Sequence, residues 1–134
     1  MELLRLRPAW EGKDVVYASV SPYAGSEVSP APYYELPDGN LHTKLALVRV
    51  FFAALLLVIK LRPLWVVSTG AAPGFFVVVI AKLFGAKTIW IDSIANAEVL
   101  SISGRMVRPF ADIWLTQWEH LSTPGGPEYR GSVL

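Results

Sequence analysis

The stretch that decides the fold is LWVVSTGAAPGFFVVVIAKLFGAKTIWID, which runs from residue 64 to residue 92. It begins and ends with runs rich in β-branched and aromatic residues, 64–69 and 87–92, which have the length and composition of buried strands. Between them, residues 75–84 are compatible with a helix that ends at Gly85. A strand, a helix and a second strand in this order predict two parallel strands joined by a crossover helix.

Gly70, Pro73 and Gly74 interrupt the long uncharged run between 64 and 81. A run of this length raises the question of a membrane-spanning helix, but glycine and proline at these places favour a tight turn. The stretch therefore predicts a turn between the first strand and the helix, in which small residues let a ligand approach the backbone closely. A plain strand-to-helix turn explains the same residues equally well.

The rest of the chain extends the alternation of strands and helices in both directions. Further strands are predicted at 14–20, 33–36, 113–116 and 131–134, and further helices at 41–61 and 103–110. Near-continuously apolar strands that alternate with helices predict an α/β fold with a doubly wound parallel sheet, covered by helices on both faces. At 134 residues, the whole chain, 1–134, fits one domain.

The composition indicates that another surface covers part of this domain. Hydrophobic residues make up 53% of the chain and charged residues only 17%, and the apolar share exceeds the ~45–50% of typical soluble domains. There is no cysteine, and His42 and His120 are the two histidines. These counts exclude a disulfide framework and a thiolate metal site and argue against a histidine-rich one, and no cofactor is expected.

Charge is distributed unevenly along the chain. The net charge of +1 argues against a nucleic-acid partner, which would require a clear basic excess. Between Asp38 and Asp92, however, there is no acidic residue, and the six cations there are Lys44, Arg49, Lys60, Arg62, Lys82 and Lys87. A basic and strongly apolar segment is what an anionic membrane surface attracts. Cations that simply solvate the ends of core elements are the alternative interpretation.

The helix predicted at 41–61 is apolar around most of its circumference, so it is either deeply buried or lies against lipid. Its uncharged part, 50–59, covers only about half of a ~30 Å hydrocarbon layer, which is too short to span it. The residues expected to contact the membrane surface are Arg49, Phe51, Phe52, Leu55 and Leu56.

Candidate binding residues follow the predicted strands, because ligands of open parallel sheets bind at the carboxyl ends of strands. Asp92 ends one strand and is followed by Ser93 and Asn96. Its carboxylate could accept hydrogen bonds from sugar hydroxyls or act as a base, or it could only satisfy N–H groups of the following loop. No second carboxylate lies close in sequence, so the catalytic residues remain unassigned.

Two further segments add candidates to this edge. Ser101 precedes the helix predicted at 103–110 and could cap it or help to hold an anion. Gln117 and Trp118 directly follow a predicted strand and could line a sugar site or a partner contact.

Taken together, five motifs resemble one known family. They are Ser68–Gly74, Ile91-Asp92-Ser93, Leu100–Arg105, Ala111-Asp112 and Gln117-Trp118. The chain resembles the bacterial PssD-type polysaccharide biosynthesis subunits, which are similar to the membrane-anchoring subunit of the eukaryotic two-part UDP-N-acetylglucosamine transferase of asparagine-linked glycosylation. More distantly it resembles the N-terminal half of MurG. The resemblance covers essentially the whole chain.

The resemblance implies a GT-B glycosyltransferase divided between two polypeptides. A domain of this kind recruits a catalytic subunit to the cytoplasmic face of the membrane, as a peripheral or monotopic protein, and helps to bind the lipid-linked sugar acceptor. The partner binds the nucleotide sugar. The expected substrate-binding residues are Gly70, Ala71, Pro73, Gly74, Asp92, Ser93, Asn96, Ser103, Gly104, Gln117 and Trp118.

One departure from the family pattern concerns the beginning of the sequence. Members of the family normally begin with a strand and a glycine-rich loop that ends in Gly-Gly-His-Leu, and this sequence has neither. The strand would lie in the middle of the sheet, so we expect an N-terminally truncated domain with unpaired strand edges.

Two other functions remain open at this point. A self-sufficient transferase that uses a nucleotide sugar would require a donor domain for which 134 residues leave no room. A scaffold that binds only the membrane and a partner would tolerate changes in the candidate binding residues.

Overall fold

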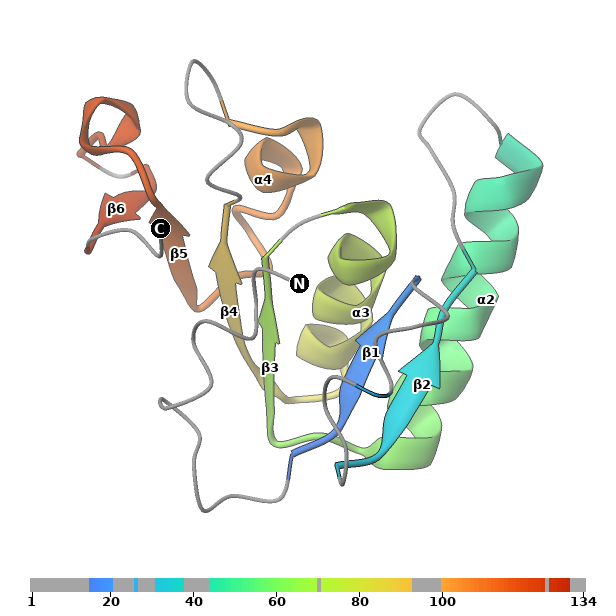
Figure 1. Cartoon of the computed structure of the whole chain (residues 1–134). Coiled ribbons are helices and arrows are strands. Elements are labelled where there is room, and N and C mark those ends of the chain that lie inside the picture. The colour runs from blue at the N-terminus through green and yellow to red at the C-terminus, as the bar shows by residue number, and fades with distance from the viewer. Residues whose placement is uncertain are drawn as a thin grey trace.

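The computed structural model describes residues 15–20, 26, 31–37, 44–69, 71–92, 100–124 and 126–130, without the side chains of residues 71 and 72. Its main elements are β1 (Tyr17–Ser19), β2 (Tyr33–Glu35), α2 (Lys44–Leu61), β3 (Trp65–Ser68), α3 (Ala71–Leu83), β4 (Lys87–Ile91), α4 (Ile102–Met106), β5 (Ile113–Thr116), the 3₁₀ turn η2 (Glu119–Leu121) and β6 (Glu128–Tyr129) (Figure 1). Strands and helices alternate, and this confirms the predicted α/β class.

Every strand pair is parallel. β3, β4, β5 and β6 form one sheet in that order, and β1 pairs with β2 in a second sheet. Within the larger sheet Ser68, Trp90 and Trp114 lie in register on neighbouring strands. The candidate residues that follow β3, β4 and β5 therefore meet at one edge, which we call the carboxyl edge.

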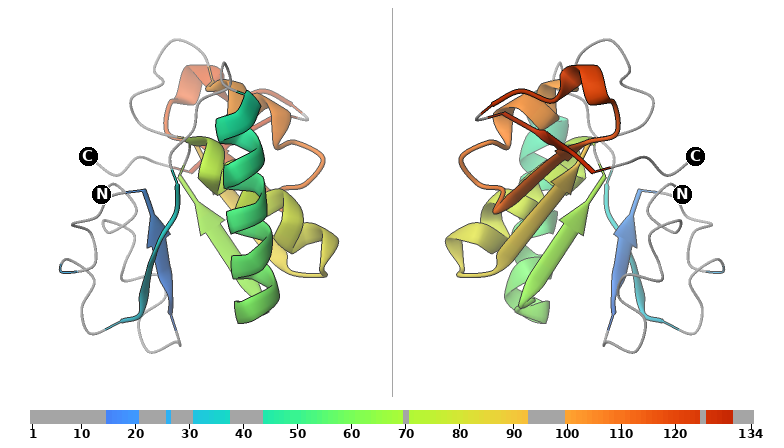
Figure 2. Two further views of the ribbon diagram at one scale, coloured as in Figure 1. Left: turned by 90° about the vertical axis from the view of Figure 1, so that its right-hand side faces the viewer. Right: turned by 90° about the vertical axis from the view of Figure 1, so that its left-hand side faces the viewer.

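The two sheets are divided between β1 and β3. These strands run in the same direction and lie side by side in Figures 1 and 2, but they do not pair with each other. The chain leaves β2, passes through α2 and enters β3 on the far side of β1, so the strand order reverses at this point. Such a reversal is where parallel α/β sheets bind ligands.

The helices α2, α3 and α4 pack on one face of the larger sheet (Figure 2). Between α2 and α3, one core cluster is built from Ala54, Val58, Ile80, Ala81 and Ala86. A second cluster joins α3 to β4 and to the end of α4 through Val78, Trp90 and Val107. Of the two helical layers expected, the described residues supply one.

Three predicted boundaries were wrong. Over the described residues 15–20, the strand predicted at 14–20 is confined to β1, in which Tyr17 is buried, while Val16 and Val20 lie outside the strand and are exposed. The helix predicted from residue 75 begins at Ala71, since proline in a first helical turn sacrifices no helical hydrogen bond. The helix predicted at 103–110 ends at Met106, where a turn follows. The strand predicted at 131–134 lies outside the described residues.

Candidate functional site

The first part of the carboxyl edge is the passage from β3 into α3. Pro73 is buried in the first turn of α3, and Gly74 lies directly against Ser68 at the end of β3. A Cβ atom on Gly74 would overlap the hydroxyl oxygen of Ser68. The helix thus approaches the strand closely at Gly74, and a larger residue here would force the Ser68 hydroxyl to turn away, which is a structural reason for the glycine that needs no ligand.

The second part is Asp92, which follows β4 and is only 1% exposed. Its carboxylate accepts hydrogen bonds from the Trp90 indole nitrogen at 3.2 Å, the Ser101 backbone nitrogen at 3.0 Å and the Ser101 hydroxyl at 2.7 Å. Charge-assisted bonds of this kind are roughly twice as strong as neutral ones. Asp92 thus joins Ser101, which follows the 93–99 segment in the sequence, to the end of β4.

These bonds continue into α4. Ser101 is the N-cap of this helix, and its hydroxyl oxygen accepts a hydrogen bond from the Gly104 backbone nitrogen at 2.8 Å. The capping role predicted for Ser101 is therefore confirmed. The Gly104 carbonyl accepts a bond of 2.9 Å from the Trp114 indole. Asp92 thus fixes Ser101, and Ser101 and Trp114 in turn fix the beginning of α4 through their bonds to Gly104.

Gly104 is the tightest point of this arrangement. A Cβ atom on Gly104 would overlap the Asp92 carboxylate and would lie 2.8 Å from the Ser101 hydroxyl oxygen. Gly104 and the neighbouring Ser103 are both buried. The structure therefore brings Asp92, Ser103 and Gly104 together.

The third part follows β5. Gln117 is buried, and its side-chain nitrogen donates to the Asp92 carbonyl at 3.1 Å. Trp118 is half-buried, and its ring lies 6.0 Å from that of the exposed His120. Trp118 is thus the candidate that offers an aromatic surface near solvent. Aromatic surfaces of this kind suit the apolar faces of sugars or prenyl chains.

Some predicted site residues lie outside the described part of the chain. These are Gly70, Ser93 and Asn96, together with the side chain of Ala71. The structure brings the others together as the ends of β3, β4 and β5 and the beginnings of α3 and α4.

The predicted membrane contacts lie on α2 and differ in exposure. Arg49, Phe52 and Leu56 are exposed, and 68% of the surface of Leu56 is accessible to solvent. Phe51 lies at the margin of the exposed face of α2, where its ring contacts those of Phe52 and Phe76. Leu55 is half-buried and packs against the core.

An exposed apolar stripe runs along α2 on the side away from the core. We call it the α2 stripe, and it consists of Leu45, Val48, Phe52, Leu56 and Ile59. The spacing of three and four residues places these side chains on one helical face. The buried residues of the helix, Val50, Ala54 and Val58, lie on the opposite face.

Sequence reasoning missed three residues of this stripe, namely Leu45, Val48 and Ile59. They continue the spacing of Phe52 and Leu56 in both directions, but the opposite face of the helix is also apolar, so the spacing alone could not single them out. At the carboxyl edge it missed Trp90 as a partner of Asp92, although residues two apart on a strand share a face.

A separate polar cluster lies at the opposite, amino end of the strands. The Asp112 carboxylate accepts bonds from the Lys82 ammonium at 2.6 Å and the Thr88 backbone nitrogen at 2.8 Å. The fully buried Thr88 hydroxyl donates to the Phe110 carbonyl at 2.5 Å. The hydrogen bond from Lys82, followed by that from the Thr88 backbone, lowers the pKa of Asp112 below its ordinary value of 3.8.

Within the described ranges, no group of three or more histidine, aspartate or glutamate side chains is placed to hold a metal ion. Among the helices of these ranges, none combines the length and hydropathy needed to cross a bilayer.

The sequence of this chain matches a protein family over residues 35–132, which is most of its length. The family is described as "Oligosaccharide biosynthesis protein Alg14 like". The chain belongs to the Alg14 family. This membership confirms the resemblance drawn from the five motifs.

Curated Alg14 relatives match over shorter segments. The protein named UDP-N-acetylglucosamine transferase subunit alg14 from Schizosaccharomyces pombe is 39% identical over 57 residues, which cover 40% of this chain and 27% of that protein. The Candida albicans subunit of the same name is 31% identical over 77 residues, which cover 53% of this chain and 35% of that protein. The matched segments thus span about a quarter to a third of these relatives.

The fold is also that of a solved MurG structure. The crystal structure of Acinetobacter baumannii MurG superposes with a TM-score of 0.77 at 12% sequence identity, over 98% of this chain and 40% of that one. The Alg14-family chain therefore has a MurG-like, Rossmann-type α/β fold, as the resemblance implied.

Proposed function

We propose that this chain is the membrane-associated subunit of a two-part UDP-N-acetylglucosamine transferase, acting in oligosaccharide or polysaccharide biosynthesis. It recruits a catalytic subunit to the cytoplasmic face of the membrane and helps to bind a lipid-linked sugar acceptor. The observation that carries the proposal is the Alg14 family match over residues 35–132. The names of the curated relatives, which call each of them a transferase subunit, support it.

The names of the curated relatives support a division of labour, because each of them is called a subunit of a transferase. We assign the binding of the nucleotide sugar to a separate catalytic subunit. The two chains would form a heterodimer in which this chain alone is inactive.

The membrane role rests on the α2 stripe. Five large apolar side chains, of which Leu45 is 84% exposed, form a continuous face on an 18-residue helix. Exposed apolar faces of this extent mark interaction surfaces. Lys44 lies on one flank of the stripe and Arg49 on the other, where their side chains can reach lipid headgroups, while the Lys60 ammonium lies over the Tyr34 ring. We propose Arg49, Phe52 and Leu56 as contacts, with Phe51 at the margin, and leave out the core-packed Leu55.

For the acceptor, we propose the carboxyl edge near the division between β1 and β3. Gly70, Ala71, Pro73 and Gly74 would let the acceptor headgroup approach the backbone, and Ser93, Asn96 and Trp118 would contact the sugar or the lipid. Asp92, Ser103, Gly104 and Gln117 are buried and bonded within the protein. We assign them the role of holding this edge in shape.

A measurement on Trp118 tests the acceptor role. In a transfer assay with labelled UDP-N-acetylglucosamine, a polyprenyl-linked acceptor and the catalytic partner, Trp118→Ala should raise the KM for the acceptor several-fold and leave the KM for the nucleotide sugar unchanged. Trp65→Ala, which removes an exposed tryptophan at the other end of β3, is the matched control. Equal effects of both variants would refute an acceptor site at Trp118.

A pure scaffold is the second candidate, and one observation favours it. The Asp92 carboxylate is occupied by three donors of the protein itself, so it needs no ligand to explain it. A scaffold predicts that Trp118→Ala leaves transfer unchanged, while Phe52→Ser with Leu56→Ser releases the partner from the membrane.

A further inference from the structure

An apolar hollow lies at the amino end of the strands, away from the carboxyl edge. The turn from α2 into β3 and the turn from α3 into β4 meet there (Figure 1). The hollow has a volume of about 440 Å³, and its lining includes Val58, Ile59, Arg62, Leu64, Ala81 and Phe84. Buried Val58 and Ala81 form its floor. We call it the turn-end hollow.

The rim of the hollow is formed by large apolar side chains that remain in solvent. Leu64 is 83% exposed and Phe84 59% exposed, and Ile59 contributes a further exposed edge. Ile59 also ends the α2 stripe, so the hollow continues that surface around the end of the helix. Burying such side chains against a partner would be favourable, because it removes apolar surface from water.

Arg62 lies at the rim of the hollow, and its backbone has a conformation that is unfavourable for residues other than glycine. It follows the last residue of α2, its backbone nitrogen donates to the Val58 carbonyl at 2.8 Å, and its φ is 45°. This is the left-handed position after a helix, which glycine usually occupies because other residues pay a steric cost there. Residues held in such conformations cluster at sites where the side chain serves a function.

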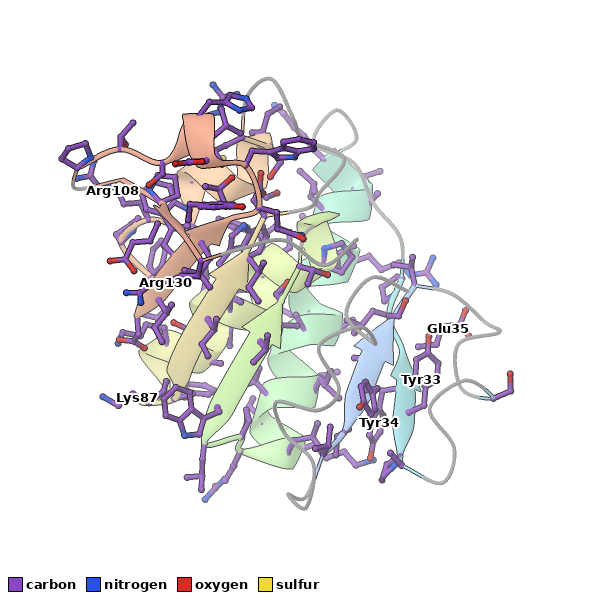
Figure 3. All side chains as sticks on the ribbon, turned by 60° about the vertical axis from the view of Figure 1, so that its left-hand side comes forward. Tyr33, Tyr34, Glu35, Lys87, Arg108 and Arg130 are labelled. Atoms are coloured by element: carbon purple, nitrogen blue, oxygen red, sulfur yellow. The ribbon has the colours of Figure 1, made fainter. Side chains whose placement is uncertain are left out.

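The surrounding charge is complementary to an anion. Residues 39–91 include no acid. Arg62 lines the hollow, and Lys87 begins β4 at the same end of the strands. Lys60 lies in the last turn of α2, where its ammonium is over the Tyr34 ring at 4.8 Å. Figure 3 shows Lys87 at the beginning of β4, far from Arg108, which lies toward the carboxyl edge. Asp112, which lies at the amino end of the strands, is paired with Lys82.

We propose that the turn-end hollow takes up one acyl chain of an anionic phospholipid, whose phosphate pairs with Arg62. This inference rests on the proposed membrane association and extends it, because the α2 stripe would lie along the bilayer surface while the hollow holds a single lipid. The domain would then be anchored at two places, and these two places would fix its orientation on the membrane.

Vesicle binding of the full chain tests this proposal. The lipids are phosphatidylcholine alone, and phosphatidylcholine with phosphatidylserine. Arg62→Gly should lower the partition coefficient on the anionic vesicles about fivefold, the effect of one cation near a charged surface. It should leave the partition on neutral vesicles unchanged. Arg62→Lys, which keeps the charge, should bind as the parent chain does. Because glycine relieves the backbone at this position, lost binding by Arg62→Gly does not reflect unfolding.

The apolar part is tested by Leu64→Ser with Phe84→Ser, which should lower binding to both kinds of vesicle about tenfold. Because the chain has no cysteine, Leu64→Cys also gives a unique site for a polarity-sensitive fluorophore. Its emission should shift to the blue on anionic vesicles, whereas the same label on Arg108→Cys should not respond.

Two outcomes would overturn the proposal, and they are distinguishable. If Leu45→Ser with Leu56→Ser abolishes binding while the Arg62 and Leu64 variants bind normally, the hollow takes up no lipid and the membrane association through α2 stands. If the parent chain binds neither kind of vesicle, the membrane association fails together with the hollow.

Discussion

Asp92 and Gly104 hold the carboxyl edge in one arrangement. The carboxylate joins the end of β4 to the N-cap of α4, and Gly104 supplies the space in which the two meet. Sequence reasoning placed Asp92 at this edge, because it follows an apolar strand. The role of Gly104 could not be predicted, because it depends on how closely α4 approaches β4, which no local pattern records, whereas the bond from Trp90 follows from the two-residue spacing on the strand.

Gly104→Ala should lower the free energy of unfolding by about 1–3 kcal/mol, since an added methyl group in a packed site forces its neighbours to move. Urea unfolding followed by circular dichroism measures the change. The matched control is Arg105→Ala, an exposed neighbour, which should change it by less than about 0.5 kcal/mol. An unchanged midpoint for Gly104→Ala would show that α4 does not need this contact.

Asp112 makes stability depend on pH at the amino end of the strands. Its pKa is lowered in the folded chain by Lys82 and the Thr88 backbone, so folding favours the ionised form. The stabilisation is therefore present above the ordinary value of 3.8 and is lost as the pH falls through the lower, folded value. Asp112→Asn should be less stable than the parent near neutral pH, and the two should converge in acid. A constant difference in the free energy of unfolding at every pH would contradict this account.

At the scale of elements, α2 has two apolar faces with different roles. Val50, Ala54 and Val58 are buried against the rest of the fold, while the α2 stripe faces outward. The sequence predicts this helix well, because its residues favour a helix over a long run. It does not reveal which face is buried, since both faces are apolar and the hydrophobic pattern has little contrast.

Paired substitutions on the two faces of α2 should separate stability from membrane binding. Val58→Ala should cost about 2 kcal/mol of unfolding free energy, because it leaves space in a packed core. Leu56→Ser, two residues away, should change stability by less than about 0.5 kcal/mol and should weaken vesicle binding. Thermal unfolding and vesicle flotation measure the two quantities. Equal destabilisation by both variants would mean that the stripe is covered within the folded chain.

The end of α2 offers a test of backbone strain. Arg62→Gly should raise the free energy of unfolding by about 1 kcal/mol, because glycine adopts a positive φ without a clash between its Cβ and the backbone. Chemical unfolding of the two variants compares them directly. A loss of stability would show that the arginine side chain contributes more to the fold than its conformation costs.

At the scale of the whole molecule, the chain has a MurG-like α/β fold. The order of strands and helices could be predicted because each strand is an apolar run between turn residues, and the five motifs pointed to the family. The division between β1 and β3 was expected only through the resemblance. The absence of described helices from the second sheet face was not expected, because strand periodicity does not indicate what covers a sheet.

The most direct test of the account is transfer of N-acetylglucosamine by separated and combined subunits. The chain and its partner are purified from their native membranes and are assayed separately and combined. Each assay supplies labelled UDP-N-acetylglucosamine and vesicles that contain a polyprenyl-linked acceptor. The account predicts no transfer by this chain alone, little by the partner alone, and full transfer by the pair bound to the vesicles. Transfer by this chain alone, or undiminished transfer by the partner without it, would contradict the account.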